Sequence, residues 1–269
     1  MVLEKYKQKR NFTSTPEPSG DLTLAAERAK KEPSKGLFFC VQKHLASHLH
    51  YDFRLEYKGV LLSWAVPKGP SLDTKTKRLA MHVEDHPIEY GTFEGVIPEG
   101  YGAGIVMLWD QGTWTPQADD VDAALKKGDL KFTLDGYKLK GSWVLVRTGG
   151  RYPGGSGDRS WLLIKHKDEW AGDLDITTFA PLSVKSEGDF AEILAGGNPE
   201  IWISNRPAQG GETGAMFQKI VERALEMRGT ATTVTPTKAA RATGRTAAKK
   251  KPAASKKPAA KKPAARRRT

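Results

Sequence analysis

The sequence predicts a mainly β protein: a small antiparallel β-barrel of about eight strands, a few short helices and a disordered basic C-terminal tail. Three observations carry this prediction. From Leu37 to about Asp168, short apolar stretches recur between clusters of glycine and proline. Several of these stretches alternate apolar and polar residues, as strands with one buried face do. Residues 229–269 contain thirteen Lys and Arg and no acidic residue, so they cannot build a core.

The chain divides into segments at shifts in composition. A basic stretch followed by Thr15-Pro16-Glu17-Pro18 predicts an extended arm, with one short helix over Leu22–Lys31. Beyond residue 172 the apolar spacing predicts helices at Phe190–Leu194 and Thr213–Arg228, with Thr213 as the N-cap of the second. The expected segments are an N-terminal arm at 1–35, the barrel at 36–172, an extension with a helix at 173–228 and the tail at 229–269.

The barrel segment contains stretches with the length and alternation of strands. Asp135-Gly136 between two of them predicts a hairpin turn. The glycine-rich stretch Pro98–Gly104 lacks the spacing and the trailing Lys-Ser or Lys-Thr of a nucleotide-binding loop, so it predicts a turn between strands. The predicted strands are Phe38–Lys43, His48–Tyr57, Val60–Val66, Arg78–Asp85, Ile105–Asp110, Lys131–Leu134, Tyr137–Arg147 and Trp161–His166.

The strand predicted at His48–Tyr57 has an unusual polar face. Its polar residues advance two at a time and alternate with leucine and aromatic residues, so they share one side. A solvated face is usually built from Lys, Glu, Thr and Ser, whereas imidazole, carboxylate and guanidinium together can bind a divalent metal and an anion. In a barrel, this face and a similar one at 81–86 can both point into the mouth. The two faces consist of His48, His50, Asp52, Arg54 and Glu56, and of His82, Glu84 and His86.

Two imidazoles and a carboxylate form a candidate metal site. His44, His50 and Asp52 offer two nitrogen ligands and one oxygen ligand, which suits Mn, Fe or Zn and leaves positions open for water or substrate. The alternative is that they are exposed polar residues of an edge strand, and their phasing with His48 within nine residues argues against it. His48 is a ligand, a phosphate contact or a rim residue.

Cationic and hydroxyl side chains near this site predict anion binding. Arg54 suits bidentate phosphate binding, with a surface ion pair as the equal alternative when Arg54 is taken alone. Arg78, His86 and Tyr90 strengthen the phosphate interpretation, although Tyr90 can equally be a core aromatic with its hydroxyl in water. Lys68 follows a strand in a stiff Pro-Lys-Gly-Pro loop, where it either faces a phosphate or is simply solvated.

Charge and composition restrict the function classes. Without the thirteen tail cations, the 43 basic residues fall to 30 against 31 acidic ones, so the net charge of +12 comes from the tail. Such a tail binds polyanions by counterion release, which makes non-specific DNA the expected partner; a solubility tail without a specific role is the alternative. A single cysteine excludes an intramolecular disulfide, and no apolar stretch approaches the roughly 20 residues of a membrane span. We expect a cytoplasmic, nucleoid-associated protein with no membrane partner.

Several long strings resemble the 3′-phosphoesterase domain of bacterial DNA ligase D. The resemblance covers about residues 5–170 in the family's order, from the arm to the last core strand. No ligase or polymerase module accompanies it, so the resemblance predicts a stand-alone form. The strings are Gln42 to His44, Leu49 to Glu56, Ser63 to Pro70, Val83 to Pro87, Glu94 to Gly100 and Trp161 to His166, with Lys9 to Phe12 and Thr15 to Pro18 in the arm.

The resemblance implies a small β-barrel enzyme that uses Mn²⁺, with Co²⁺ or Zn²⁺ as further candidates. The family heals DNA 3′ ends, including RNA-containing ends, during non-homologous end joining. It removes a terminal ribonucleoside to leave a 3′-phosphate and then hydrolyses that phosphate; DNA ligase D and Ku are the implied protein partners. The implied metal ligands are His44, His50 and Asp52, and the implied catalytic residues are Arg54, His86 and Tyr90, supported by Lys68, Arg78, Gln42 and Glu84. Arg10, Asn11, Glu17 and His48 are the implied substrate-binding residues.

This chain departs from the family pattern at three places. Asn11 stands where the family commonly has an aspartate, which bears on nucleoside removal more than on phosphate release. His48 stands where arginine is common. The glycine loop at Glu99-Gly100-Tyr101 is one residue shorter than the usual form.

Two other function classes stay open on the sequence. Two histidines and a carboxylate with open positions also suit ferrous iron in an oxygenase-type barrel. The surplus of Arg, Lys and Tyr near the ligands argues against that class. The other class is a non-enzymatic module that docks on nucleic-acid ends.

Overall fold

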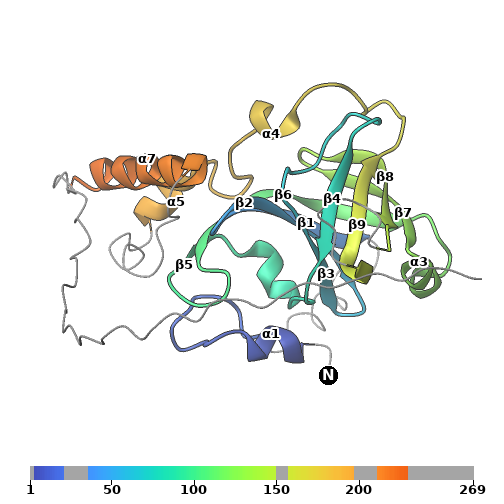
Figure 1. Ribbon diagram of the computed structural model, residues 1–269, viewed down its shortest axis with the longest axis horizontal. Helices are drawn as coiled ribbons and strands as arrows, with labels where there is room; N and C mark the ends of the chain where they lie inside the picture. Colours follow the sequence, from blue (N-terminus) through green and yellow to red (C-terminus); the bar gives the residue numbers. More distant parts are fainter. Residues whose placement is uncertain (1–2, 21–35, 150–156, 197–210, 230–269) are drawn as a thin grey trace, which may run out of the picture. The chain divides into compact units, whose positions relative to one another are not determined.

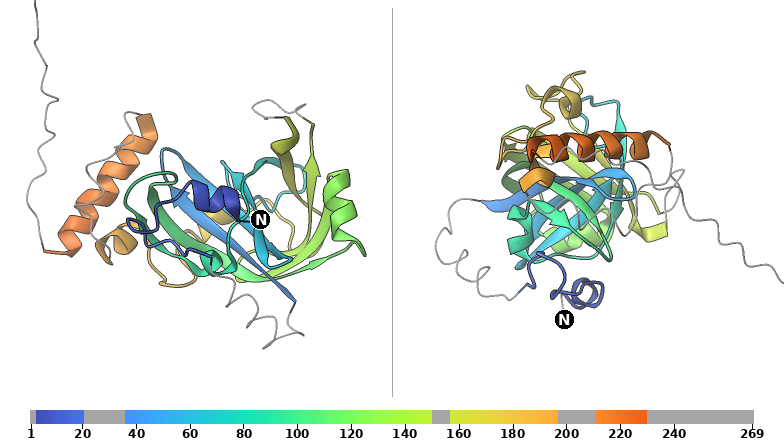
Figure 2. Two further views of the ribbon diagram at one scale, coloured as in Figure 1. Left: turned by 90° about the horizontal axis from the view of Figure 1, so that it is seen from below. Right: turned by 90° about the vertical axis from the view of Figure 1, so that its left-hand side faces the viewer.

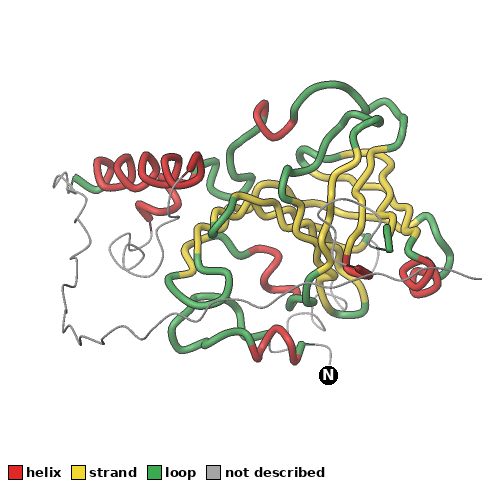
Figure 3. Tube along the Cα trace, viewed as in Figure 1, coloured by secondary structure: helices red, strands yellow, loops and turns green. Residues whose placement is uncertain are grey.

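The structure is a computed structural model that describes residues 3–20, 36–149, 157–196 and 211–229. Its strands build one antiparallel sheet, and short helices and loops surround it (Figure 3). The strands are β1 (Leu37–Leu45), β2 (Leu49–Tyr57), β3 (Val60–Val66), β4 (Lys77–His82), β5 (Gly95–Ile97), β6 (Gly104–Pro116), β7 (Asp129–Gly136), β8 (Lys140–Arg147) and β9 (Ser160–Lys165).

Eight of these strands close into a barrel (Figure 1). They follow the order β1-β2-β3-β4-β9-β8-β7-β6, and β1 also pairs with β6 to complete the ring. β6 is 13 residues long, so its other edge can pair with both β5 and β7, and β5 lies outside the ring. The predicted antiparallel barrel of about eight strands is confirmed. The sequence did not predict β5.

The helices are short except at the C-terminal end. The bounds of helix α3 have local causes. At its start the Asp120 side chain accepts a hydrogen bond from Ala123 N at 3.0 Å, and at its end Gly128 adopts a left-handed conformation with a φ of 80°. No described helix is long and apolar enough to cross a membrane. The helices are α1 (Glu4–Gln8), η1 (Ile88–Thr92), α3 (Val121–Lys127), η2 (Gly157–Arg159), α4 (Ile176–Phe179), α5 (Phe190–Gly196) and α7 (Gly211–Met227).

The apolar face of β2 points into the barrel interior. Tyr51, Phe53 and Leu55 pack in a core with buried residues of the other barrel strands. Neighbouring residues of a strand point to opposite faces, so Asp52 and Arg54 lie on the outer side of the barrel wall. The prediction that the polar face points into the barrel mouth is therefore wrong. Alternation defines two faces, and the large apolar side chains occupy the inner one.

A second, smaller core covers this outer wall. It joins Tyr6 of α1 and Tyr90 of η1 to Cys40, Leu61 and Leu108 of the barrel strands. Figures 1 and 2 show α1 and the turn of η1 on the side of the wall that is built from β1, β2 and β6. The polar residues of the wall are therefore enclosed between barrel and arm, where charges interact more strongly than in water.

The β7–β8 hairpin forms, but its turn lies two residues later than predicted. Gly136 N donates to Leu139 O at 2.9 Å, so Tyr137 and Lys138 make the turn. Asp110 of β6 explains the shift, because its carboxylate accepts the backbone N–H groups of Lys138 at 3.0 Å and Leu139 at 2.8 Å. A tertiary contact thus decides the turn, against the local preference for Asp-Gly.

Other boundaries also differ from the prediction. β4 ends at His82, so His82, Glu84 and His86 do not share a strand face as predicted. α7 begins at Gly211, which places Thr213 inside the helix and not at its N-cap. α5 covers the helix predicted at Phe190–Leu194. The helix predicted at 22–31 and the tail from residue 230 lie outside the described residues, and the predicted segment boundaries stay predictions.

The extension after β9 returns to the barrel. Trp109 Nε1 of β6 donates to Ala180 O at 2.7 Å, and Val184 N donates to Leu108 O at 2.9 Å. Phe190 of α5 and Ala224 of α7 join the main core. The extension is thus packed against β6, the strand that closes the barrel.

Candidate active site

The β1–β2 hairpin brings the three predicted metal ligands together. His44 of β1 is paired directly with His50 of β2, and Asp52 lies two residues further along the same face. His44 Nδ1 lies 3.6 Å from Asp52 Oδ2, and His50 Nε2 lies 3.7 Å from Asp52 Oδ1. The three candidate ligand atoms all lie within 4.8 Å of one another. We call these three residues the metal cluster.

Two backbone carbonyls hold the histidine rings in place. His44 Nε2 donates to Gly102 O at 2.9 Å, and His50 Nδ1 donates to His48 O at 3.0 Å. A carbonyl oxygen can only accept, so the bonded ring nitrogens carry protons, and the other ring nitrogens, His44 Nδ1 and His50 Nε2, face Asp52. His48 contributes here through its backbone, while the residue itself is exposed.

The metal cluster fits a divalent metal ion. Two imidazole nitrogens and one carboxylate are a common ligand set that leaves further positions open. Histidines that bind metal usually donate their other N–H to a carbonyl or carboxylate, as both do here. The donor set admits manganese, iron, cobalt and zinc.

Burial and neighbouring charges set the protonation of the metal cluster. Burial acts to raise the pKa of Asp52, but Arg54 and the two histidines outweigh it and hold that pKa well below its usual range. Burial lowers the pKa of His50, so its ring stays neutral. Both states are those that metal binding requires.

Arg54 is buried and makes three hydrogen bonds to protein side chains. Its Nε donates to Gln42 Oε1 at 2.8 Å, its Nη1 to Ser63 Oγ at 2.8 Å, and its Nη2 to Asp52 Oδ2 at 3.0 Å. The guanidinium also lies 4.9 Å from the ring centroid of Tyr90. Arg54 is therefore a fixed positive charge beside the metal cluster, held from three directions.

Gln42 and Ser63 form the support of Arg54. Gln42 Nε2 donates to the carbonyl oxygens of Tyr90 and Phe93, both at 2.9 Å, which joins β1 to η1. Ser63 was not a predicted site residue. It faces Arg54 across the β2–β3 pairing, and the available signal was a lone hydroxyl among the apolar residues of β3.

His86 lies close to Arg54 and is bound on both ring nitrogens. Its Nδ1 donates to Glu84 O at 2.8 Å, and its Nε2 accepts from Arg10 Nη2 at 3.2 Å. An antiparallel bridge to Leu61 fixes its backbone. Burial, together with Arg54 and Arg10, lowers the pKa of His86 well below its usual range, so the ring is neutral.

The N-terminal arm reaches this site through its basic residues. Arg10 Nε donates to Glu17 Oε1 at 2.8 Å, and both side chains are nearly inaccessible to solvent. Lys9 Nζ donates to Glu84 Oε2 at 2.9 Å. Asn11 is exposed and accepts from the Thr13 hydroxyl at 2.7 Å. The structure thus brings Arg10, Glu17 and Glu84 to His86 and leaves Asn11 at the surface.

Other predicted site residues take separate positions. The Tyr90 ring is buried, 4.9 Å from the His86 ring centroid. Lys68 is exposed in the loop after β3. Arg78 of β4 lies near Asp73 and Asp175, whose pKa values it helps to lower.

His82 is also separate from His86. Its ring stacks near Trp64 and Trp161, with centroid distances of 5.1 Å and 6.4 Å. Because β4 ends at His82, the alternation that seemed to join His82 to His86 stops there.

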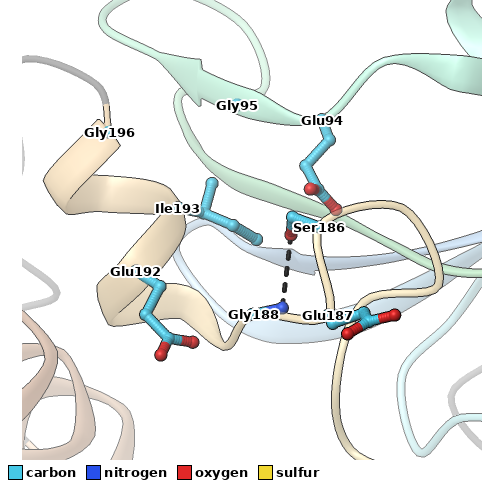
Figure 4. A pocket seen from close by; sticks show the side chains of 8 residues that line it. All are labelled: Glu94, Gly95, Ser186, Glu187, Gly188, Glu192, Ile193 and Gly196. Atoms are coloured by element: carbon cyan, nitrogen blue, oxygen red, sulfur yellow. Dashed lines mark hydrogen bonds between the residues drawn. The ribbon is translucent and has the colours of Figure 1, made fainter.

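A pocket of about 420 Å³ lies elsewhere, between Glu94-Gly95 and the extension (Figure 4). Its carboxylates come from Glu94, Glu187 and Glu192, which makes it unsuited to a phosphate anion. It contains none of the predicted site residues. The candidate active site is therefore the outer wall with the metal cluster, Arg54 and His86.

Comparisons with known proteins agree with this geometry. Residues 42–147 match the family described as the DNA Ligase D 3′-phosphoesterase domain. Residues 42–147 are a DNA ligase D 3′-phosphoesterase domain. The match includes the metal cluster, Arg54 and His86, whereas Arg10 and Glu17 precede the matched range.

The relatives that this chain matches are much longer proteins. The chain is 50% identical over 218 residues to the multifunctional non-homologous end joining protein LigD of Pseudomonas aeruginosa, which covers 79% of this chain and 24% of that protein. For LigD of Mycolicibacterium smegmatis the identity is 37% over 201 residues, which cover 72% of this chain and 24% of that protein. For LigD of Mycobacterium tuberculosis the identity is 44% over 149 residues, which cover 55% of this chain and 18% of that protein. The chain spans about a quarter of these relatives or less.

Proposed function

We propose that this chain heals DNA 3′ ends in non-homologous end joining. It hydrolyses a terminal 3′-phosphate to a 3′-hydroxyl, and it removes a 3′-terminal ribonucleoside in a preceding diesterase step. The observation that carries the proposal is the adjacency of the metal cluster to the fixed charge of Arg54, within a 3′-phosphoesterase domain. Its substrates are DNA ends and RNA-containing DNA ends, and its proposed protein partners are DNA ligase D and Ku.

His44, His50 and Asp52 would hold the metal, for which we propose Mn²⁺ with Co²⁺ and Zn²⁺ as alternatives. A divalent ion at this position supplies a Lewis acid for a phosphoryl oxygen. The chain contributes an ionised Asp52 and two imidazoles that are already oriented by Gly102 and His48. Little rearrangement is then needed on metal binding.

Arg54 and Arg10 would neutralise charge on the phosphate. Arg54 is held by three hydrogen bonds, so its charge is in place before the transition state forms. Arg10 is held by Glu17 and by the neutral ring of His86, a weaker partner that a phosphate oxygen can replace. Lys68 and Arg78 stay further candidates for phosphate contact from the family resemblance.

His86 would respond to the bound phosphate. A phosphate dianion beside the ring favours the imidazolium, because nearby negative charge raises the pKa of a histidine. His86 Nε2, which accepts from Arg10 in the free protein, would then donate. It would serve either as a general acid toward the leaving oxygen or as a hydrogen-bond donor to a phosphoryl oxygen.

The basic tail would raise the local concentration of the enzyme on DNA. Its thirteen cations bind a polyanion without sequence preference. This role is independent of the metal cluster and places the protein at the nucleoid.

Phosphate release from a 3′-phosphate primer–template tests the proposal. The purified full-length chain is first analysed for bound metal, then assayed with Mn²⁺, with EDTA and without any oxidant. We expect phosphate release that requires the divalent metal, and release of a terminal ribonucleoside from an RNA-ended primer. Metal binding without either product would contradict the proposal and favour a non-enzymatic end-binding module. A requirement for an oxidant would favour an oxygenase.

A further inference from the structure

The loop next to the metal cluster exposes one aromatic ring. Tyr101 has 51% of its surface exposed, and it lies between Gly100 and Gly102, whose φ angles are 85° and 82°. Those positive φ values favour glycine at both positions. Gly102 O is the acceptor that orients His44. The ring is therefore tied through its own backbone to a candidate metal ligand.

The N-terminal arm places cations around the same ring. Lys9 Nζ lies 4.2 Å from the ring centroid of Tyr101, and the Arg10 guanidinium lies 5.9 Å from it. Lys9 is also paired with Glu84, two residues before His86. The ring thus stands between the metal cluster and the basic residues of the arm.

Exposure of this ring needs an explanation. The apolar contacts of Tyr90 and Tyr6 bury those rings, whereas Tyr101 stays open beside the site. An exposed aromatic ring next to cations is the combination by which proteins bind single-stranded nucleic acid, since every base offers a π-face and every nucleotide a phosphate.

We propose that Tyr101 is the stacking platform for the base of the 3′-terminal nucleotide. This inference rests on the proposed function, because the terminal phosphate must lie at the metal cluster for the terminal base to reach Tyr101. Stacking tolerates any base, so Tyr101 selects nucleotide ends over other phosphate esters and not one sequence over another. Lys9, which lies at the same ring, contacts the backbone phosphate on the 5′ side of the terminal nucleotide.

Four variants separate stacking from other roles of the ring. Tyr101→Ala removes the ring, Tyr101→Phe keeps the ring without the hydroxyl, and Tyr101→Leu keeps apolar bulk without a π-face. Tyr137→Ala is the matched control, because Tyr137 is an exposed tyrosine, 72% accessible, in the β7–β8 turn.

Binding is measured in EDTA, so that no turnover occurs, with a primer that ends in a 3′-phosphate and has 2-aminopurine as its terminal base. We expect the wild type, Tyr101→Phe and Tyr137→Ala to quench its fluorescence, and Tyr101→Ala and Tyr101→Leu to lose the quenching. Equal quenching by the wild type and Tyr101→Ala would overturn the proposal. This readout needs no turnover, so it stands even if the proposed phosphate release fails.

Kinetics with two 3′-phosphate primers give the second readout. On a primer with a terminal base, Tyr101→Ala should raise KM by about 5- to 150-fold with a smaller change in kcat. On a primer whose terminal nucleotide is abasic, Tyr101→Ala and the wild type should have equal KM. An equal loss on both primers would overturn stacking and assign Tyr101 to support of the loop. Absence of phosphate release by the wild type would instead contradict the proposed function.

Discussion

Arg54 donates from Nη2 to Asp52 Oδ2 at 3.0 Å, and the two residues are neighbours on the outer face of β2. A buried cation is thus paired with the buried carboxylate of the metal cluster. Two further donors of Arg54 are used by Gln42 and Ser63. This arrangement keeps Asp52 ionised before a metal arrives, at the cost of burying two charges that depend on each other.

Arg54→Met should lower the free energy of unfolding by about 3–5 kcal/mol. Removal of one partner leaves the charge of Asp52 buried without compensation. Urea unfolding of the metal-free protein measures the loss. The double variant Arg54→Met with Asp52→Asn should recover part of it, because no buried charge is left. A loss below about 1 kcal/mol in the single variant would mean that solvent or another cation replaces Arg54.

His50→Ala should abolish both phosphate release and nucleoside removal. It should also weaken Mn²⁺ binding by more than about 100-fold, because losing a ligand costs more than losing a ligand's outer hydrogen bond. His48→Ala is the matched control, since His50 donates to the backbone carbonyl of His48 and that group survives the change. Calorimetry of Mn²⁺ binding checks both variants. Retained manganese-dependent phosphate release in His50→Ala would remove His50 from the metal cluster.

The contribution of His86 to the free energy of unfolding of the metal-free protein should fall as the pH falls below about 6.5. The buried His86 has a lowered pKa, so between that pKa and about 6.5 the unfolded chain binds a proton that the folded chain does not. Stability is complete above about 6.5 and levels off below the folded pKa. His86→Gln should reduce the slope by up to about 1.4 kcal/mol per pH unit. Urea unfolding across this range checks it, and equal slopes for both proteins would show that His86 protonates freely when folded.

Asn11→Asp should change nucleoside removal and leave phosphate release unaltered. Asn11 is exposed in the arm and contacts Thr13, not the metal cluster. A carboxylate at this position restores the residue common in the resembling family, so we expect faster ribonucleoside release. Initial rates on an RNA-ended primer and on a 3′-phosphate primer separate the two steps. An equal change in both rates would place Asn11 in a role common to both.

Deletion of residues 229–269 should weaken DNA binding and flatten its dependence on salt. The deleted segment contains thirteen cations, and each contact with a phosphate contributes to the salt slope. Turnover on a saturating short substrate should stay at the wild-type value. Binding titrations at several salt concentrations and the saturated rate are compared. A collapse of turnover would make the tail part of the active fold.

The metal cluster was predictable from the sequence because it is local. His44, His50 and Asp52 lie in one β-hairpin, and strand alternation alone puts them on one face. The barrel class was predictable for a similar reason, since each strand carries its own periodic signal. Arg54 followed from the same alternation, one step further along β2.

The surroundings of the metal cluster were not predictable in this way. Ser63 reaches Arg54 from the next strand, and Gly102 reaches His44 from a loop 58 residues away. His82 shares the predicted pattern of the site yet lies elsewhere, because β4 ends at His82 and its ring packs near Trp64 and Trp161.

The sequence by itself predicted eight of the nine strands that the structure describes, the candidate ligand set and the concentration of positive charge in the tail. Tertiary structure decided which face of the barrel wall holds the site, and that the arm and η1 cover it. Alternation specifies two faces without saying which one is inside. Which face is inside depends on strand pairings such as β1 with β6, which close the ring. It also depends on which face has the large apolar side chains that fill the enclosed space.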